Sequence, residues 1–223
     1  MEIKNVDDAR EFIKRYQLTT LLSNRFLNEL SMDIYTPKGC WDTDENPWEW
    51  KKVLVLEREC LYGKLFGKYA GFAYKNVMYD LINYRRDGYD FEARVNSMPV
   101  SDADILIYNI ISSHKNIDTK SLRALCNVDK KNKGEFDRSL ERLQMQTYIC
   151  VSSFDPQVDK NGNFYGWGIA SYSTPELLFG ERKIEKAYEK DPMESRSDLL
   201  KVLKKNTALH SDKDYEKYLD YKG

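Results

Sequence analysis

The sequence has few of the residues that bind metal ions or form disulfide bonds. It contains two histidines, His114 and His210, and four cysteines that form no CxxC pair. Zinc usually takes four closely organised nitrogen or sulfur ligands, so we expect no metal site and no cofactor. Scattered cysteines are typical of reduced, mostly buried thiols in a cytosolic protein. They are Cys40, Cys60, Cys126 and Cys150.

A long hydrophobic run is also absent from the sequence. The run Val53–Leu56 has four apolar residues, whereas a membrane-spanning helix needs about 20. The first twelve residues, MEIKNVDDAREF, are acidic where a signal peptide would be basic and then apolar. We therefore expect a soluble, cytoplasmic protein that has no membrane partner.

Neither sign of charge is in clear excess. The 35 lysines and arginines against 36 aspartates and glutamates give a formal net charge of −1. This balance excludes a histone-like protein whose whole surface attracts phosphate, but it allows a local basic patch. The hydrophobic fraction of 41% and the aromatic fraction of 13% are too high for a disordered chain. A length of 223 residues allows one large domain or two small ones.

The N-terminal part of the chain is predicted to be mainly helical. Val6, Ala9 and Phe12 recur at helical spacing, and the apolar segment Leu18–Leu30 is predicted to form a second helix that packs on the first. Pro37 interrupts the pattern that follows. The further predicted elements are a loop over 31–50, a helix over 48–66 that Gly67 and Gly71 end, an extended segment over 72–74 and a helix over 75–86.

The clearest organisation lies between residues 101 and 172. The segment Ser101–Asp104 resembles a capping box, with Asp104 in place of the usual glutamate, and precedes the apolar run Ile105–Ile111. After the extended Ile117, Thr119 is predicted to cap a short helix. In that helix Leu122 and Leu125 are expected to face inward. A third helix is predicted from Phe136, Leu140 and Leu143, which lie at positions i, i+4 and i+7.

A β-hairpin is predicted to follow these three helices. Its strands are residues 147–154 and 164–170, and the turn Asp159–Gly162 contains Asn-Gly, a strong hairpin signal. Three helices followed by a hairpin are the order of a winged helix. We therefore predict an α+β, mostly helical fold in which N- and C-terminal helices pack against a winged helix. The predicted regions are an N-terminal helical region (1–99), a winged-helix domain (100–180) and a charged C-terminal helical extension (181–223).

The C-terminal extension is highly charged. One helix is predicted there, from about Met193 to Lys205, with Leu199, Leu200 and Leu203 as its apolar stripe. The last dozen residues are expected to fray.

Basic residues are in local excess between residues 115 and 146. This segment contains eight lysines and arginines and five acidic residues, which give a net charge of +3. In helix-turn-helix proteins the second helix of the motif enters the major groove of DNA, and here that helix is 134–146. The alternative is a solvated helix face on a protein-interaction domain. The residues predicted to hold phosphates of double-stranded DNA are Lys130, Lys131, Lys133, Arg138, Arg142 and Lys160.

Two glutamines, Gln144 and Gln146, lie where the third helix gives way to the hairpin. On a strand, residues two apart point to the same side, and two amides presented together could hold one water. Glutamine is a poor base, so such a site suits a reaction whose leaving group departs readily. Hydrolysis of a cationic, alkylated nucleobase is one example. The alternative is that both side chains cap backbone groups or face solvent.

Four segments of the chain resemble one bacterial family. They are NPWEW (46–50), NYRRDGYDF (83–91), RLQMQTY (142–148) and YGWGIASYSTPE (165–176). Over residues 40–180 the chain is similar to the AlkZ-related proteins, relatives of the AlkZ/YcaQ winged-helix DNA glycosylases, which excise alkylated or crosslinked bases. In those enzymes a Gln-x-Gln motif supplies the catalytic amides. By motif match, the resemblance implies that Gln144 and Gln146 are catalytic.

Two further features have two interpretations each. Trp41, Trp48 and Trp50 either stack on a base and wedge a duplex or anchor the core. The pair Arg85-Arg86 either grips phosphate or forms a salt-bridge network with Asp87 and Asp90.

Three functions follow from these patterns. The first is a DNA-binding repair protein of the AlkZ-related type, with N-glycosidic bond hydrolysis by a monofunctional DNA glycosylase as one hypothesis. The second is a non-enzymatic transcriptional regulator, which predicts tight binding to one sequence and dimerisation. The third is a protein-interaction winged helix, which predicts no salt-dependent binding to DNA. The sequence leaves the oligomeric state open.

Overall fold

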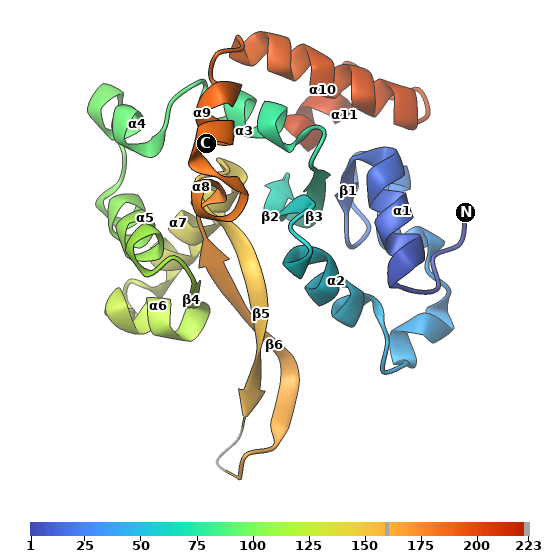
Figure 1. Ribbon diagram of the computed structural model, residues 1–223, viewed down its shortest axis with the longest axis horizontal. Coiled ribbons are helices and arrows are strands. Elements are labelled where there is room, and N and C mark those ends of the chain that lie inside the picture. The colour runs from blue at the N-terminus through green and yellow to red at the C-terminus, as the bar shows by residue number, and fades with distance from the viewer. Residues whose placement is uncertain (159–160, 221–223) are drawn as a thin grey trace.

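Two three-stranded antiparallel sheets organise the described part of the chain, and helices surround them (Figure 1). The computed structural model describes residues 1–158 and 161–220. One sheet has the order β1-β3-β2 and the other β4-β6-β5. The strands are β1 (Leu18–Thr20), β2 (Cys60–Phe66), β3 (Tyr69–Tyr74), β4 (Ile117–Asp118), β5 (Cys150–Val158) and β6 (Phe164–Ser173). The structure is therefore α+β, as predicted.

Most of the remaining chain is helical. Within the described residues, no helix has the length and apolarity that crossing a membrane requires. Three short 3₁₀ helices are η1 (Asn28–Leu30), η2 (Met32–Tyr35) and η3 (Lys38–Asp42). The α-helices are α1 (Val6–Tyr16), α2 (Pro47–Leu56), α3 (Met78–Arg86), α4 (Phe91–Ser97), α5 (Asp102–His114), α6 (Thr119–Leu125), α7 (Lys133–Met145), α8 (Pro175–Phe179), α9 (Glu181–Ala187), α10 (Pro192–Asn206) and α11 (Asp212–Leu219).

The first sheet corrects two helix predictions. The segment 18–30 begins with strand β1 instead of a helix, and residues 60–66 form strand β2 instead of continuing helix α2. All three residues of β1 and six of the seven in β2 are buried. An apolar run that is buried along its whole length has no periodicity that separates strand from helix. The pairing of both segments with β3 decides their structure.

Gly71 allows the close approach of β1 and β3. A Cβ atom at this position would lie 2.1 Å from the carbonyl oxygen of Thr19, its diagonal neighbour on β1. Only glycine leaves that space free. Gly71 therefore belongs to the centre of a sheet, and the predicted helix end at this position is wrong.

The region 101–173 has the predicted order of elements. Helices α5, α6 and α7 precede the antiparallel hairpin β5–β6, and the short strand β4 joins the hairpin at β6. Figure 1 shows the hairpin extending away from the helices. Phe136, Leu140 and Leu143 are buried on α7, as predicted. Residues 159–160 of the predicted hairpin turn lie outside the described residues.

Two details of α6 differ from prediction. Its N-cap is Asp118, whose carboxylate accepts hydrogen bonds from the backbone N–H groups of Lys120 and Ser121. The hydroxyl of Thr119, the predicted cap, instead donates to the carbonyl oxygen of Ala170 on β6 at 2.8 Å. Leu125 is 48% exposed, because α6 ends at this residue and only its Leu122 face packs inward.

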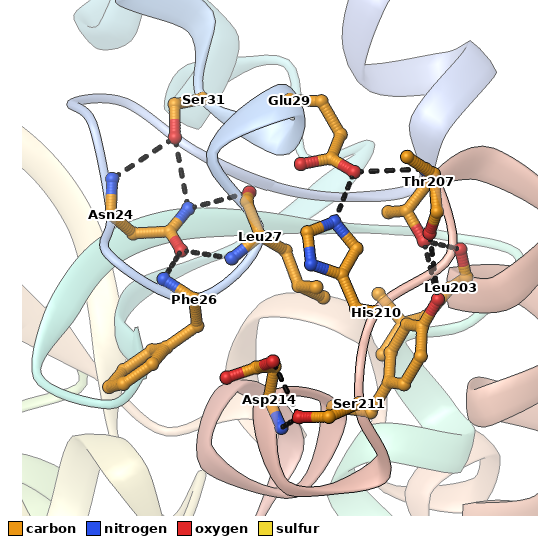
Figure 2. A network of polar contacts seen from close by, with 12 residues as sticks. Asn24, Phe26, Leu27, Glu29, Ser31, Leu203, Thr207, His210, Ser211 and Asp214 are labelled. Carbon is orange, nitrogen blue, oxygen red and sulfur yellow. Dashed lines mark hydrogen bonds and ion pairs between the residues drawn. The ribbon is translucent and has the colours of Figure 1, made fainter.

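The C-terminal residues are more ordered than predicted. Helix α10 forms as expected, with Leu199 and Leu203 fully buried. Of the last dozen residues, 212–219 form α11 instead of fraying, and 221–223 lie outside the described residues. Its Tyr218 ring stacks on Phe66 of β2, with 4.6 Å between ring centroids. Figure 2 shows that His210, between α10 and α11, contacts Glu29 of η1. The apolar side chains of α11 are thus covered by the first sheet and its neighbours.

The buried side chains form two clusters. One contains Phe12, Trp50, Phe136 and Val151, so it combines N-terminal helices with α7 and β5. The other lies between the first sheet and helices α3, α10 and α11. Residues from distant parts of the sequence therefore share both cores.

Candidate nucleic-acid interface

Four of the predicted phosphate-binding residues are exposed together on one element. Lys130 and Lys131 lie in the turn before α7, and Lys133 and Arg138 lie on the helix itself. The Asp129 carboxylate shapes this turn by accepting hydrogen bonds from the backbone N–H groups of Lys131 and Asn132. All four side chains are exposed, and those on α7 lie opposite its buried face.

Acidic residues interrupt this basic surface. Glu135 and Asp137 are also exposed on the first turns of α7. Asp137 accepts a hydrogen bond from Arg123 of α6 at 2.7 Å, which neutralises part of its charge. The net positive charge of the surface is therefore modest and concentrated at the N-terminal end of α7.

Arg142 has a different environment from the other cations. Its Nε and Nη2 atoms donate to the two carboxylate oxygens of Asp104 on α5, at 2.7 and 2.6 Å. Nη2 also lies 3.0 Å from the hydroxyl oxygens of Ser101 and Ser139. The guanidinium thus joins α7 to the start of α5. The remaining predicted contact, Lys160, lies outside the described residues.

The two glutamines are buried at the C-terminal end of α7. Gln144 is 4% exposed and Gln146 is 5% exposed. The Gln144 side chain donates from Nε2 to the Leu140 carbonyl oxygen at 3.1 Å. Its Oε1 accepts from the backbone N–H of Lys64 on β2 at 3.2 Å. Gln144 therefore binds backbone groups, which is the structural alternative that its sequence position left open.

The backbone at these glutamines differs from the strand geometry considered above. Gln144 lies within α7, and Gln146 is its C-cap with a right-handed helical backbone. Residues two apart on a helix point about 200° apart. The two amides are therefore not presented side by side as they would be on a strand.

Arg85 and Arg86 of α3 hold the segment that contains the glutamines. Arg85 donates to the carbonyl oxygens of Met145 and Leu65 at 2.6 and 2.7 Å. Arg86 is fully buried and donates to the Thr147 carbonyl oxygen at 2.6 Å. The phosphate-gripping interpretation is wrong, because both guanidinium groups are buried.

The counter-ion of Arg86 is Glu176, at the start of α8. Burial opposes the charge of Arg86, but the Glu176 carboxylate together with Tyr188 and Tyr148 outweighs this effect and keeps the guanidinium pKa above its ordinary value. The hydroxyl of Tyr188 also lies 2.6 Å from Arg86. Three of the segments that carry the family resemblance, around Arg86, Gln144 and Glu176, thus meet in one buried network.

Comparison with known proteins assigns the chain to a family. A family model described as AlkZ related matches residues 3–220. The chain belongs to the AlkZ-related family. No curated protein and no solved structure matches it. The predicted resemblance is therefore confirmed, and it extends well beyond residues 40–180.

The tryptophans of this AlkZ-related protein have separate roles. Trp50 is 3% exposed and belongs to the core, which confirms the anchor interpretation for this residue. Trp41 and Trp48 are partly exposed and pack edge to face, with 5.7 Å between ring centroids. Lys51, in the middle of helix α2, is buried and contacts the Trp48 ring. Sequence analysis missed Lys51, and its position directly after Trp48 and Trp50 was the available signal.

Metal chemistry has no visible site in the described part of the AlkZ-related protein. Within residues 1–158 and 161–220, no three His, Cys, Asp or Glu side chains are grouped so that they could hold a metal ion. Cys60 and Cys150 are buried, and burial raises the pKa of both thiols above the ordinary value. These two thiols therefore belong to the packed interior.

Proposed function

We propose that this AlkZ-related protein binds double-stranded DNA through a winged helix formed by residues 100–180. The supporting observation is the combination of topology and charge. The order α5-β4-α6-α7-β5-β6 places a helix before an extended hairpin, and the turn and first half of that helix carry four exposed cations. In this proposal α7 is the recognition helix, the β5–β6 hairpin is the wing, and regions 1–99 and 181–223 flank them.

The four cations have distinct tasks in this proposal. Recognition helices contact DNA through their N-terminal residues, where the helix dipole also favours phosphate. Lys130, Lys131 and Lys133 would hold phosphates beside the groove, and Arg138, one turn further along α7, would reach deeper. Arg142 would instead fix the angle between α7 and α5 through Asp104.

Titration of a labelled duplex at several salt concentrations tests this proposal. A protein that replaces counterions at phosphates loses affinity linearly on a log–log plot against salt, with a slope near −0.9 for each phosphate contacted. We expect the slope to become shallower in the Lys131→Ala and Arg138→Ala variants. Absence of salt-dependent binding by the wild-type protein would contradict DNA binding and favour a protein-interaction domain.

Excision of alkylated bases is the finer proposal that the family relationship supports. Gln144 and Gln146 match the Gln-x-Gln motif, and Arg85 and Arg86 fix the backbone on either side of Gln146. In this proposal Gln146 and Gln144 orient the attacking water after the hydrogen bonds of Gln144 rearrange. The cationic base supplies most of the driving force, since it leaves readily.

A base-excision assay separates the structural and catalytic roles of the glutamines. Duplexes that contain N7-alkylated guanine are incubated with wild-type protein and with the Gln144→Ala and Gln146→Ala variants. The free energy of unfolding of each variant is measured in parallel. Loss of excision in a folded variant supports catalysis, whereas unchanged excision in both, or none by the wild-type protein, contradicts it. Enrichment of one sequence from random duplexes would instead indicate a transcriptional regulator.

A further inference from the structure

Lys51 is a buried amine without a counter-ion. It lies on the inward face of α2 and is 7% exposed. Its Nζ atom is 4.0 Å from the ring centroid of Phe154 and 4.8 Å from that of Trp48. The nearby Glu49 carboxylate pairs with Lys52 at 2.5 Å instead. Within the described residues, Lys51 has these ring contacts and no ion pair or hydrogen bond.

This environment raises the neutral fraction of the Lys51 amine. Burial removes water from the ammonium, and the charge of Lys52 adds repulsion. Together they outweigh Glu49 and lower the pKa of Lys51 to about 8. At about pH 7.5 such an amine is roughly one-quarter neutral, whereas about one part in a thousand of an ordinary lysine is neutral. The rings offset only part of the cost of burying the charge.

The position of Lys51 connects it to the proposed DNA interface. Phe154, its nearest ring, belongs to strand β5 of the hairpin that we assign as the wing. Trp48, the other ring in contact with the amine, packs against the partly exposed Trp41. Two aromatic rings thus contact the amine where helix α2 packs on strand β5.

We propose that Lys51 is a nucleophilic amine that forms an imine with an aldehyde, and that this aldehyde is the ring-opened sugar of an abasic site in DNA. This inference rests on the proposed binding of DNA along the wing. A buried lysine with a lowered pKa is the usual amine for imine formation with carbonyl groups. An abasic site is also what hydrolytic removal of a base leaves behind.

The proposed step needs no oxidant, reductant or metal. The lone pair of the neutral Nζ attacks the aldehyde carbon and forms a C–N bond, which gives a carbinolamine. The C–O bond then breaks, and the two amine protons leave with that oxygen as one water molecule. The product is an imine between Nζ and the sugar carbon, and hydrolysis reverses it. Trp48 and Phe154 restrict water at Nζ and thereby prolong the life of the imine.

Reductive trapping tests the proposal in the full chain. The protein is incubated with a labelled duplex that holds one abasic site and with cyanoborohydride, which reduces an imine to a stable amine. Denaturing electrophoresis measures the covalent adduct, and peptide mass spectrometry locates it. We expect the adduct at Lys51 and a loss of about tenfold or more in Lys51→Arg, because a guanidinium forms no imine but retains the ring contacts. The control Lys52→Arg should retain the adduct.

Two further measurements separate this inference from DNA binding. Binding of an intact duplex to wild-type protein and Lys51→Arg reports on the interface alone. Pyridoxal phosphate, a small free aldehyde, followed by borohydride reports on the amine alone and needs no variant. If the duplex binds but the adduct is undiminished in Lys51→Arg or maps elsewhere, the inference is overturned. If no duplex binds, preferential labelling of Lys51 by pyridoxal phosphate supports the reactive amine. Absence of that labelling overturns the inference.

Discussion

Arg142 and Asp104 join helices α7 and α5 through two parallel hydrogen bonds. Nε and Nη2 of Arg142 each donate to one oxygen of the Asp104 carboxylate, at 2.7 and 2.6 Å. The carboxylate is 6% exposed and the guanidinium 31% exposed, so the pair lies at the edge of the interior. A paired carboxylate and guanidinium in this geometry fix both distance and angle between the helices.

Loss of this pair should lower the free energy of unfolding, although it removes only one partly buried positive charge. We expect Arg142→Ala to reduce the free energy of unfolding by about 1–3 kcal/mol, because it leaves a buried carboxylate with fewer partners. The loss stays below the 3–5 kcal/mol or so of a fully buried pair, since water reaches the guanidinium side. Urea unfolding measures the change. The control, Arg138→Ala on the same helix, should unfold within about 0.5 kcal/mol of wild type.

The exposed cations of the α7 region should matter for DNA binding and not for stability. Alanine at Lys130, Lys131, Lys133 or Arg138 should leave stability nearly unchanged and weaken binding to duplex DNA. Each phosphate contact removed should reduce the salt slope by about 1. Lys183→Ala, an exposed lysine on α9, is the matched control and should change neither affinity nor slope. Equal effects at Lys183 and Lys131 would show that binding follows total charge instead of this surface.

The sequence predicted well those elements whose pattern is local. Phe136, Leu140 and Leu143 lie on one face of one helix, so their spacing alone predicted α7. Ser101 caps α5 as expected, through a hydrogen bond from the Asp104 backbone N–H. The reciprocal bond of a capping box was expected from the Asp104 side chain. That carboxylate binds Arg142, which is 38 residues away and invisible to local analysis.

Elements that depend on distant partners were predicted poorly. Leu18–Thr20 is a strand because it pairs with β3 more than fifty residues later in the chain. Tyr218 orders the C-terminal helix because it stacks on Phe66 and donates to the Leu18 carbonyl oxygen. The same limit applies to the candidate site. The basic surface follows from nearby residues of α7 and the turn before it, whereas the distant partners of Gln144 and Arg86 come from β2, the loop before β5, and α8.

Gly71 should be among the least replaceable residues of the first sheet. An added Cβ would lie 2.1 Å from the Thr19 carbonyl oxygen and close to the Phe66 ring, so β1 would have to separate from β3. We expect Gly71→Ala to lower the free energy of unfolding by about 3 kcal/mol or more. Gly39→Ala is the control, since its Cβ meets no atom within 4 Å. Similar stability of the two variants in urea would contradict the proposed close approach.

Glu29 and His210 should make the C-terminal helices sensitive to acid. The Oε1 atom of Glu29 accepts from the Ala208 backbone N–H at 2.9 Å and lies 2.6 Å from His210 Nε2 (Figure 2). Burial opposes ionisation of this carboxyl group, but its hydrogen bonds outweigh burial and hold the pKa of Glu29 below its ordinary value of 4.5. The ionised carboxylate therefore holds the chain between α10 and α11 against η1.

The sign of the pH effect follows from that lowered pKa. A group whose pKa is lower in the folded than in the unfolded state stabilises the fold fully above its unfolded pKa, here about 4.5. That contribution is lost as the pH falls through the folded value. We expect Glu29→Gln to be less stable than wild type at neutral pH and to lose less stability on acidification. Urea unfolding between about pH 7 and pH 3 measures both effects.

Two variants make this prediction specific. Glu185→Gln changes an exposed carboxylate on α9 and should leave the acid dependence as in wild type. His210→Ala should reduce stability at neutral pH, since it removes one partner of the carboxylate but keeps the Ala208 hydrogen bond. Its acid dependence should therefore fall between those of wild type and Glu29→Gln. If wild type and Glu29→Gln lost stability in parallel on acidification, Glu29 would not be the group that couples the C-terminal helices to pH.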